Sequence, residues 1–120
     1  MGDDKASAVL TFLTAEYHAF ESAARAGHIE QAWRHLERAH IVAQARLWPH
    51  CRSHWKMLIF AIGLRDWREA GGQMVRLLLA PAGNLTGRLP VGNSGRANIS
   101  AFARAEIPPD LLAFVDPGSH

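Results

Sequence analysis

Apolar residues recur at helical spacing through the first two-thirds of the chain, and this pattern predicts four helices. Their approximate ranges are 6–26, 28–46, 49–65 and 66–80. Gly27 interrupts the pattern between the first two helices. Pro49 suits the first turn of the third helix, where its missing N–H would have no partner in any case. Asp66 is a plausible N-cap for the fourth, which the residues "PAG" at 81–83 are expected to end.

The segment from 81 to 120 differs from what precedes it. It is dense in Gly, Pro and Asn, which is typical of turns rather than regular elements. A loop of this length is usually functional or wraps another part of the protein. Its scattered apolar residues favour an arm that packs along the helices, and they are Leu85, Leu89, Val91, Ile99, Phe102 and Ile107. The residues "PPDLLAFV" at 108–115 can add one short helical turn.

A faint internal repeat relates the two halves of the helical part at an offset of about 38 residues. The stretch "HIEQAWRHLERA" from His28 aligns with "DWREAGGQMVRL" from Asp66. This indicates two helical hairpins, weakly similar to tetratricopeptide-type repeats, but two units are too few for a solenoid. We therefore expect one all-α domain over residues 1–120, with four helices in two hairpins and a long irregular C-terminal arm.

Composition narrows the class of protein. The 120 residues are 48% apolar and 20% charged, which is ordinary for a globular domain. The net charge of +2 comes from scattered arginines and does not indicate a nucleic-acid partner. No apolar run is long enough to span a membrane, and the acidic start "MGDD" does not look like a signal peptide. With one cysteine, Cys51, no internal disulfide is possible, and a cytoplasmic location is expected.

Three of the four predicted apolar stripes contain titratable residues. Glu16 lies in the stripe of the first helix, His40 in that of the second, and His50 and His54 in that of the third. The stripe of the fourth helix contains none and is read as Trp67, Gly71, Met74 and Leu78. Because an unpaired buried polar group costs roughly 2–7 kcal/mol, these side chains should satisfy one another inside the bundle.

A divalent metal ion would do this, because it takes neutral imidazole nitrogens and offsets the charge of a carboxylate. His50 and His54 are four residues apart, so both rings can reach one ion, and the helix start disfavours protonation of His50. Glu37 and His40 form one Glu-x-x-His pair, whereas a di-iron bundle needs two. We therefore predict a single iron, manganese or zinc ion on His40, His50, His54 and Glu16, with Glu37 beside a ligand or as a further ligand.

Such a protein would be a metal-dependent oxidoreductase or hydrolase if a coordination position stays open, and the metal would be structural if the site is closed. The main alternative is an interaction module or homodimer whose histidines and glutamate form a metal-free core network. Taken singly, His40 can be a core histidine that is hydrogen-bonded to a backbone carbonyl or a carboxylate. Glu16 can reach solvent at the stripe edge, and His50 with His54 can be a partly exposed helix start. Haem binding and a catalytic pairing of Cys51 with a histidine are less favoured.

The residues "GNSG", Gly92, Asn93, Ser94 and Gly95, are followed by Arg96. They can form a backbone nest for an anion. The preferred alternative is a plain turn in which the glycines take positive φ. The loop lacks the lysine and the following helix of a phosphate-binding loop.

At "LERAHIVAQ", "HCRSHW", "GGQMVR" and "LPVGNSGRANIS", followed by "IPPDL", the chain resembles a family of short bacterial proteins known as a domain of unknown function. The resemblance covers about residues 28–112. It includes the three histidines, a Gly-Gln-x-x-Arg at 72–76 and a Gly-Asn-Thr-Gly in which Ser94 here replaces Thr. It implies no activity. It does imply that the histidines and the glycine loop belong to one design, and it makes Gln73 and Arg76 candidates for holding the arm in place.

Overall fold

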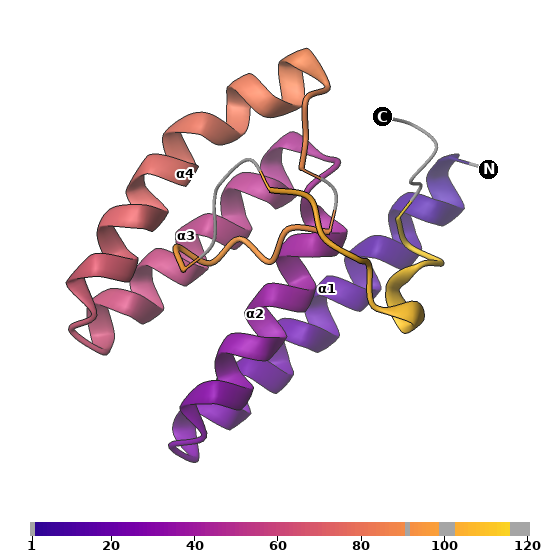
Figure 1. Ribbon diagram of the computed structural model, residues 1–120. Coiled ribbons are helices and arrows are strands. Elements are labelled where there is room, and N and C mark those ends of the chain that lie inside the picture. The colour runs from indigo at the N-terminus through magenta and orange to yellow at the C-terminus, as the bar shows by residue number, and fades with distance from the viewer. Residues whose placement is uncertain (1, 91, 99–102, 116–120) are drawn as a thin grey trace.

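The computed structural model describes residues 2–90, 92–98 and 103–115, and within these ranges the chain is all-α, without a strand. The elements are α1 (Gly2–Arg25), α2 (Ile29–Ala43), α3 (Leu47–Gly63), α4 (Trp67–Thr86) and a 3₁₀ turn η1 (Pro109–Leu111). Helices α1 and α2 form one hairpin and α3 and α4 the other, as predicted, and α2 packs on α3 to join them (Figure 1).

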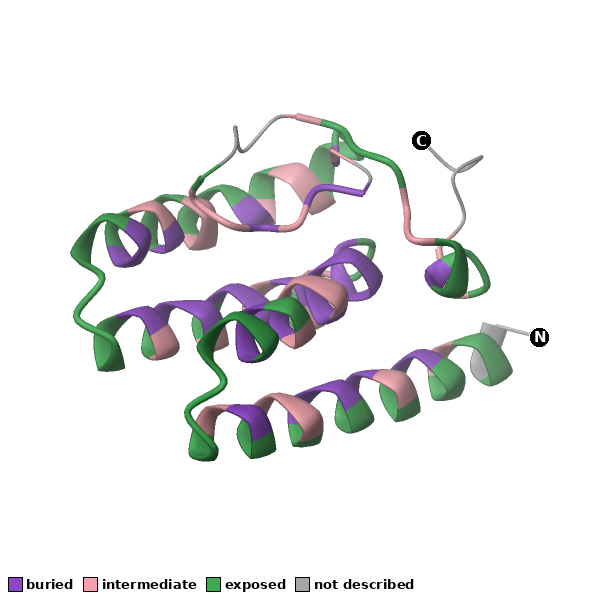
Figure 2. Ribbon diagram, turned by 60° about the horizontal axis from the view of Figure 1, so that its bottom comes forward, coloured by how far each residue is buried: buried purple, intermediate pink, exposed green. Residues whose placement is uncertain are grey.

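The core lies between α1, α2 and α3, where the stripes predicted for these helices are mostly buried (Figure 2). It has an aliphatic centre around Leu36 and Met57, and Phe20, Trp33 and Phe60 pack edge-to-face beside it. Buried Glu16, His40, His50 and His54 confirm that the titratable residues of these stripes point inward.

Helix α4 does not end at "PAG" but continues to Thr86, so this predicted end was wrong. Proline in a helix interior removes one hydrogen bond and crowds the preceding turn. Tertiary contacts outweigh that cost beyond Pro81. Ala80 is buried, and the Asn84 side chain contacts the Gln44 carbonyl at the end of α2 and His50 on α3. The helix ends instead at Gly87, which takes φ 71°.

The buried face of α4 also differs from the prediction. The residues read as its inward stripe, Trp67, Gly71, Met74 and Leu78, are all exposed, and the face turned to the protein carries Glu69, Ala70, Gln73 and Ala80. Apolar residues occupy positions 74, 75 and 77–79 and therefore lie on all sides of the helix. The spacing of apolar residues consequently does not show which face of α4 is buried. Despite this apolar character, no described helix combines the length and hydropathy needed to cross a membrane.

The arm that follows α4 crosses the helices, as expected (Figure 1). Leu89 and Asn93 are buried, and the Gln73 side chain donates to the Gly95 carbonyl at 2.8 Å, which confirms that Gln73 anchors the arm. The short turn predicted within 108–115 is η1, with Phe114 stacked on Phe12 of α1 at 4.7 Å between ring centroids. Leu85 belongs to α4 and is exposed, while Val91, Ile99 and Phe102 lie outside the described residues.

Candidate metal centre

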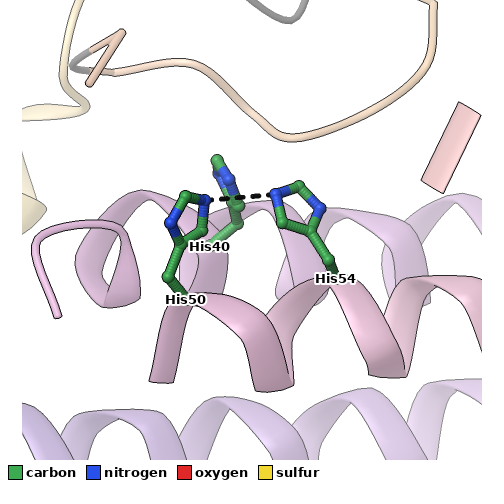
Figure 3. A group of neighbouring side chains, drawn as sticks. All are labelled: His40, His50 and His54. Carbon is green, nitrogen blue, oxygen red and sulfur yellow. Dashed lines mark hydrogen bonds between the residues drawn. The ribbon is translucent and has the colours of Figure 1, made fainter. Parts of the chain in front are cut away.

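Three histidines meet where α2 packs on α3. His40 comes from the last turn of α2, and His50 and His54 lie one turn apart near the start of α3 (Figure 3). All three side chains are buried, and one ring nitrogen from each lies within 4.8 Å of the others. The sequence prediction that these residues come together is confirmed.

The Nδ1 atom of each histidine faces a carbonyl oxygen from another part of the chain. The pairs are His40 with the main-chain oxygen of Asn93 at 2.8 Å, His50 with Asn84 Oδ1 at 2.7 Å, and His54 with Gln73 Oε1 at 2.8 Å. Because these oxygens only accept hydrogen bonds, each Nδ1 carries a hydrogen and donates it. The Nε2 atom of each neutral ring is then left with a lone pair, the form that binds metal.

Independent contacts fix the two amide groups in the orientation that this requires. The Nδ2 of Asn84 donates to the Gln44 carbonyl at 2.9 Å, so its Oδ1 must face His50. The Nε2 of Gln73 donates to Glu69 Oε2 and to the Gly95 carbonyl, both at 2.8 Å, so its Oε1 must face His54. Flipping either amide would turn its oxygen toward the Gln44 carbonyl, or toward the Glu69 carboxylate and the Gly95 carbonyl, and so place acceptors against acceptors. Metal-binding histidines commonly have such oxygen partners on their other ring nitrogen.

The Nε2 atoms of His50 and His54 lie 3.2 Å apart (Figure 3). With both Nδ1 atoms protonated, neither Nε2 of the neutral rings has a hydrogen to donate, so two lone pairs face one another. Only a cation between them, a proton or a metal ion, makes this contact favourable.

Burial opposes the proton. It holds the pKa of His40 well below the usual value, with His54 and His50 adding to the effect. Burial also lowers the pKa of His50, although its hydrogen bond to Asn84 acts in the opposite direction. It lowers the pKa of His54 to about 4. At neutral pH the three rings are therefore neutral and suited to binding a metal ion.

The structure does not bring Glu16 to this group. Its carboxylate is buried as predicted, but it accepts hydrogen bonds from His35 Nδ1 at 2.6 Å and Arg38 Nε at 2.8 Å. Arg38 also binds Asp110 at 2.6 Å, so the group ties α1, α2 and η1 together. The position of Glu16 in the apolar stripe of α1 correctly predicted that its side chain is buried. Its hydrogen-bond partners depend on how α2 is rotated against α1, which the stripe does not specify.

Glu37 also lies outside the three-histidine group. Its carboxylate is 3.4 Å from the Arg96 guanidinium and is partly exposed. Burial raises the pKa of Glu37, while Arg96 opposes that shift. Cys51, on α3, is half-buried and has no disulfide, and burial raises the pKa of its thiol. Cys51 is not among the described residues that line the cavity beside the histidines.

The glycine loop covers His40. Gly92 and Gly95 take φ 82° and 86°, as the plain-turn alternative expected. The N–H of Gly95 donates to Asn93 Oδ1 at 2.8 Å, and the N–H of Arg96 to Ser94 Oγ at 3.3 Å, so these groups are already used within the loop. These two N–H groups are therefore not turned toward an anion, and the loop packs on the His40 ring.

Gly95 is required by space as well as by its backbone angle. A Cβ atom at this position would lie 2.7 Å from Cγ of His40, closer than real contacts allow. The absence of a side chain therefore lets the arm lie directly on the imidazole and place the Asn93 carbonyl on Nδ1.

Glu69 belongs to the network around the candidate site, and sequence reasoning missed it. Its carboxylate is buried and accepts from Gln73 Nε2, Arg96 Nε at 2.9 Å and the N–H of Ala97 at 2.8 Å. Arg96 in turn lies over the Trp33 ring at 3.8 Å. The signal was the polar pair Glu69 and Gln73, four residues apart on one face, which a search for apolar stripes passes over.

A cavity of about 330 Å³ opens beside the three histidines. Residues of the last half of α4 and of the arm form its other walls, and they include Arg76, Leu79, Gly83, Arg88, Leu89 and Pro90. An ion on the histidines would be reached from this cavity rather than sealed in the core.

Fold and site define a small two-hairpin helical protein with a buried three-histidine group at the junction of its hairpins. The chain belongs to the family described as a protein of unknown function, DUF3703, whose model matches residues 7–115. No curated protein and no solved structure matches the chain. The predicted membership of a family of unknown function is thus confirmed.

Proposed function

We propose that His40, His50 and His54 bind one divalent metal ion through their Nε2 atoms and that the ion keeps an open coordination position. The observation that carries the proposal is the hydrogen-bond pattern. Each Nδ1 hydrogen is donated to an oxygen, which leaves the Nε2 lone pair of each ring unused, and one ring nitrogen from each residue lies within 4.8 Å of the others. A metal-free core network would instead place donors against acceptors among the three rings.

The distances suit a single ion. Bonds of about 2.0–2.1 Å from a tetrahedral zinc to imidazole nitrogens place two such nitrogens about 3.3 Å apart. The Nε2 atoms of His50 and His54 are 3.2 Å apart already. The widest separation in the group is within 4.8 Å, so small rotations of the side chains bring the third ligand to the ion.

The ligand set favours some metals over others. Imidazole suits zinc, iron, copper and nickel, whereas manganese and magnesium prefer carboxylate and other oxygen ligands. Glu16 and Glu37 are both engaged by cations elsewhere and supply no oxygen to the group. Among the three metals that the sequence suggested, the site therefore favours zinc or iron over manganese.

Three protein ligands and an adjoining cavity are typical of catalytic rather than structural metal sites, which are usually closed by four protein ligands. Zinc here would support hydrolysis through an activated water, and iron would support an oxidoreductase reaction. The identity of the ion would thus narrow the reaction class.

The test is metal analysis of protein made without a His-tag and reconstituted anaerobically with zinc or iron(II). We expect about one ion per chain in the parent protein. The variant His50→Asn should lose it, whereas His18→Ala, which removes an exposed histidine of α1, should retain it. A parent protein that binds neither ion, or equal loss from both variants, would overturn the proposal.

The alternative function, an interaction module or homodimer, is favoured by a different observation. Large apolar side chains are exposed on α3 and α4, with Trp48 at 78%, Leu78 at 75% and Leu85 at 80%. Apolar patches of this kind often mark contact surfaces. Sedimentation at several concentrations tests this, since a mass that doubles with concentration supports self-association and a constant monomer mass counts against it.

A further inference from the structure

We propose that a groove between α1 and α3 binds a carboxylate with an apolar body, whose oxygens are held by Arg52 and by the hydroxyl of Tyr17. Among the described residues, the groove shares no lining side chain with the cavity beside the three histidines. It is therefore a second site, and the inference does not depend on the proposed metal ion.

The groove has the size and lining of a site for a small apolar molecule. Its volume is about 510 Å³, within the range of about 300 to 1,000 Å³ that ligand sites span. Trp48 and Trp55 line it and are 78% and 53% exposed. Other apolar side chains from α1, α3 and α4 contribute to the lining, namely Leu10, Leu13, Pro49 and Leu77. An apolar ligand that covers the exposed indole rings removes them from water, which favours binding.

The charge of the groove favours an anion. Arg52 is the one charged side chain among the described residues that line it. Its guanidinium carbon lies 5.4 Å from the centroid of the Tyr17 ring, and Nζ of Lys56 lies 4.7 Å from the same centroid. Within the described part of the chain, no carboxylate forms an ion pair with either cation. A carboxylate in the groove would supply the anion that these two cations lack.

Tyr17 adds a hydrogen-bond donor. Its side chain is only 6% exposed, and its hydroxyl has no hydrogen-bond partner among the residues that the structure describes. A buried hydroxyl without a partner is unfavourable, and a carboxylate oxygen that accepts from it removes this penalty. The charge of Arg52 lowers the pKa of Tyr17 against the larger effect of burial, which agrees with a guanidinium near this hydroxyl.

The ligand reaches the hydroxyl by displacing the side chains that lie over the Tyr17 ring. In the structure the hydroxyl oxygen is covered. Arg52 and Lys56 have long, flexible side chains, and such chains change rotamer readily at a protein surface. In the proposed complex they turn toward the carboxylate, and the hydroxyl then donates to its second oxygen.

A second copy of the chain suits this groove less well than a carboxylate. In a two-fold dimer the same surface of both copies takes part in the contact. Through this groove, such a contact would bring Arg52 and Lys56 of both copies together without an acidic residue among the described lining residues. Like charges that meet in this way oppose association.

The experiment is isothermal titration calorimetry on the full chain in the presence of a chelator, which keeps metal ions away from the histidines. The probe is 2-naphthoate, and 2-naphthamide has the same apolar body without the charge. We expect 2-naphthoate to bind at about one site per chain, with naphthamide and inorganic phosphate at least about tenfold weaker.

Matched variants locate the binding site. Arg52→Gln should weaken naphthoate binding about tenfold, whereas Arg68→Gln, at an exposed position of α4 outside the groove lining, should leave it unchanged. Trp48→Ala should also weaken it about tenfold. Trp67→Ala, which removes a tryptophan that is 65% exposed and outside the lining, should not.

Tyr17→Phe tests the part assigned to the hydroxyl. Because this hydroxyl has no partner among the described residues, its removal should not lower the free energy of unfolding. It should nevertheless weaken naphthoate binding about three- to tenfold, because one hydrogen bond to the carboxylate is lost.

The inference is overturned if naphthoate does not bind, if naphthamide binds as tightly, or if Arg52→Gln or Tyr17→Phe binds naphthoate as the parent protein does. Sedimentation is measured in parallel. A dimer that Trp48→Ala dissociates, in a protein that does not bind naphthoate, would mean that a second copy occupies the groove and would overturn the inference as well. None of these results bears on the metal site, whose failure is detected by metal analysis.

Discussion

The Nε2 atoms of His50 and His54 face each other at 3.2 Å in the core, and the Nδ1 hydrogens of both rings are donated elsewhere. Two lone pairs at this separation repel in a metal-free protein and become two ligands when an ion lies between them. The same spacing of four residues along α3 that buries both side chains also sets this distance. The contact is therefore a place where stability and metal binding are coupled.

The Gln73 side chain links His54 to the arm, and replacing Gln73 should lower both the stability of the protein and its affinity for the metal ion. In Gln73→Leu, the Nδ1 hydrogen of His54 and the Gly95 carbonyl lose their partners. We expect a loss of about 1–3 kcal/mol in the free energy of unfolding. Metal affinity should fall about 10- to 100-fold. Urea unfolding and a competitive zinc titration measure the two effects, and Gln31→Leu, at an exposed position of α2, serves as the control. Equal behaviour of the two variants would speak against the link.

Gly95 should be intolerant of any side chain. Gly95→Ala places a methyl group 2.7 Å from Cγ of His40, whereas Gly27→Ala, at a similar φ of 78°, meets nothing within 4 Å. Both variants carry the backbone strain, but only the first adds the clash. We expect Gly95→Ala to lose about 1–3 kcal/mol more stability than Gly27→Ala. Thermal or urea unfolding of the pair checks this, and indistinguishable losses would show that the loop does not lie on the imidazole.

The stability of the metal-free protein should fall as the pH falls below neutrality. Burial lowers the pKa of His54 from 6.5 to about 4, so between these values the unfolded chain takes up a proton that the folded chain does not. The unfolded state then binds more protons, and the free energy of unfolding decreases by up to about 1.4 kcal/mol per pH unit for this residue. Below about pH 4 the contribution of His54 levels off, because both states are protonated.

Urea unfolding in the presence of a chelator, at several values between pH 4 and 7, measures this slope. The variant His54→Asn should reduce this slope by the part due to His54 and leave the part due to His40 and His50. The variant His18→Ala, which removes an exposed histidine, serves as the control. A slope unchanged by His54→Asn would mean that His54 does not titrate as its buried position requires.

Tyr17 is the only tyrosine of the chain and reports on the core between α1 and α3. Its ring is buried, and its hydroxyl has no hydrogen-bond partner among the described residues. Burial raises the pKa of Tyr17 to about 12. Ultraviolet titration of the folded protein should therefore show almost no phenolate at pH 10.5, while the urea-unfolded chain titrates near 10. A midpoint near 10 in the folded protein would place the ring in solvent.

The helical pattern predicted much of the site because burial follows from spacing. His40, His50 and His54 each fall on an apolar stripe, and the packing of α2 on α3 brings those stripes together. The same reasoning correctly predicted that Glu16 is buried, but it predicted the wrong neighbours for this residue. A stripe shows which face of a helix points inward, but not which residues of the next helix that face contacts.

The rest of the site depends on contacts that no local pattern contains. Asn84 reaches His50 only because α4 continues beyond Pro81, and the Asn93 carbonyl reaches His40 only because the arm folds back across the helices. The buried face of α4 was missed because Glu69 and Gln73 point inward while most of the large apolar side chains of this helix are exposed. The hydrogen-bond partners of the histidines therefore follow from the tertiary structure and not from the local sequence pattern.

The most direct test of the metal centre is an X-ray absorption spectrum at the metal edge of the reconstituted, tag-free protein. An ion on His40, His50 and His54 should show three imidazole nitrogens at about 2.0–2.1 Å, with one or two oxygens completing the coordination. A spectrum with a sulfur shell near 2.3 Å, or one with oxygen ligands and no imidazole, would contradict it.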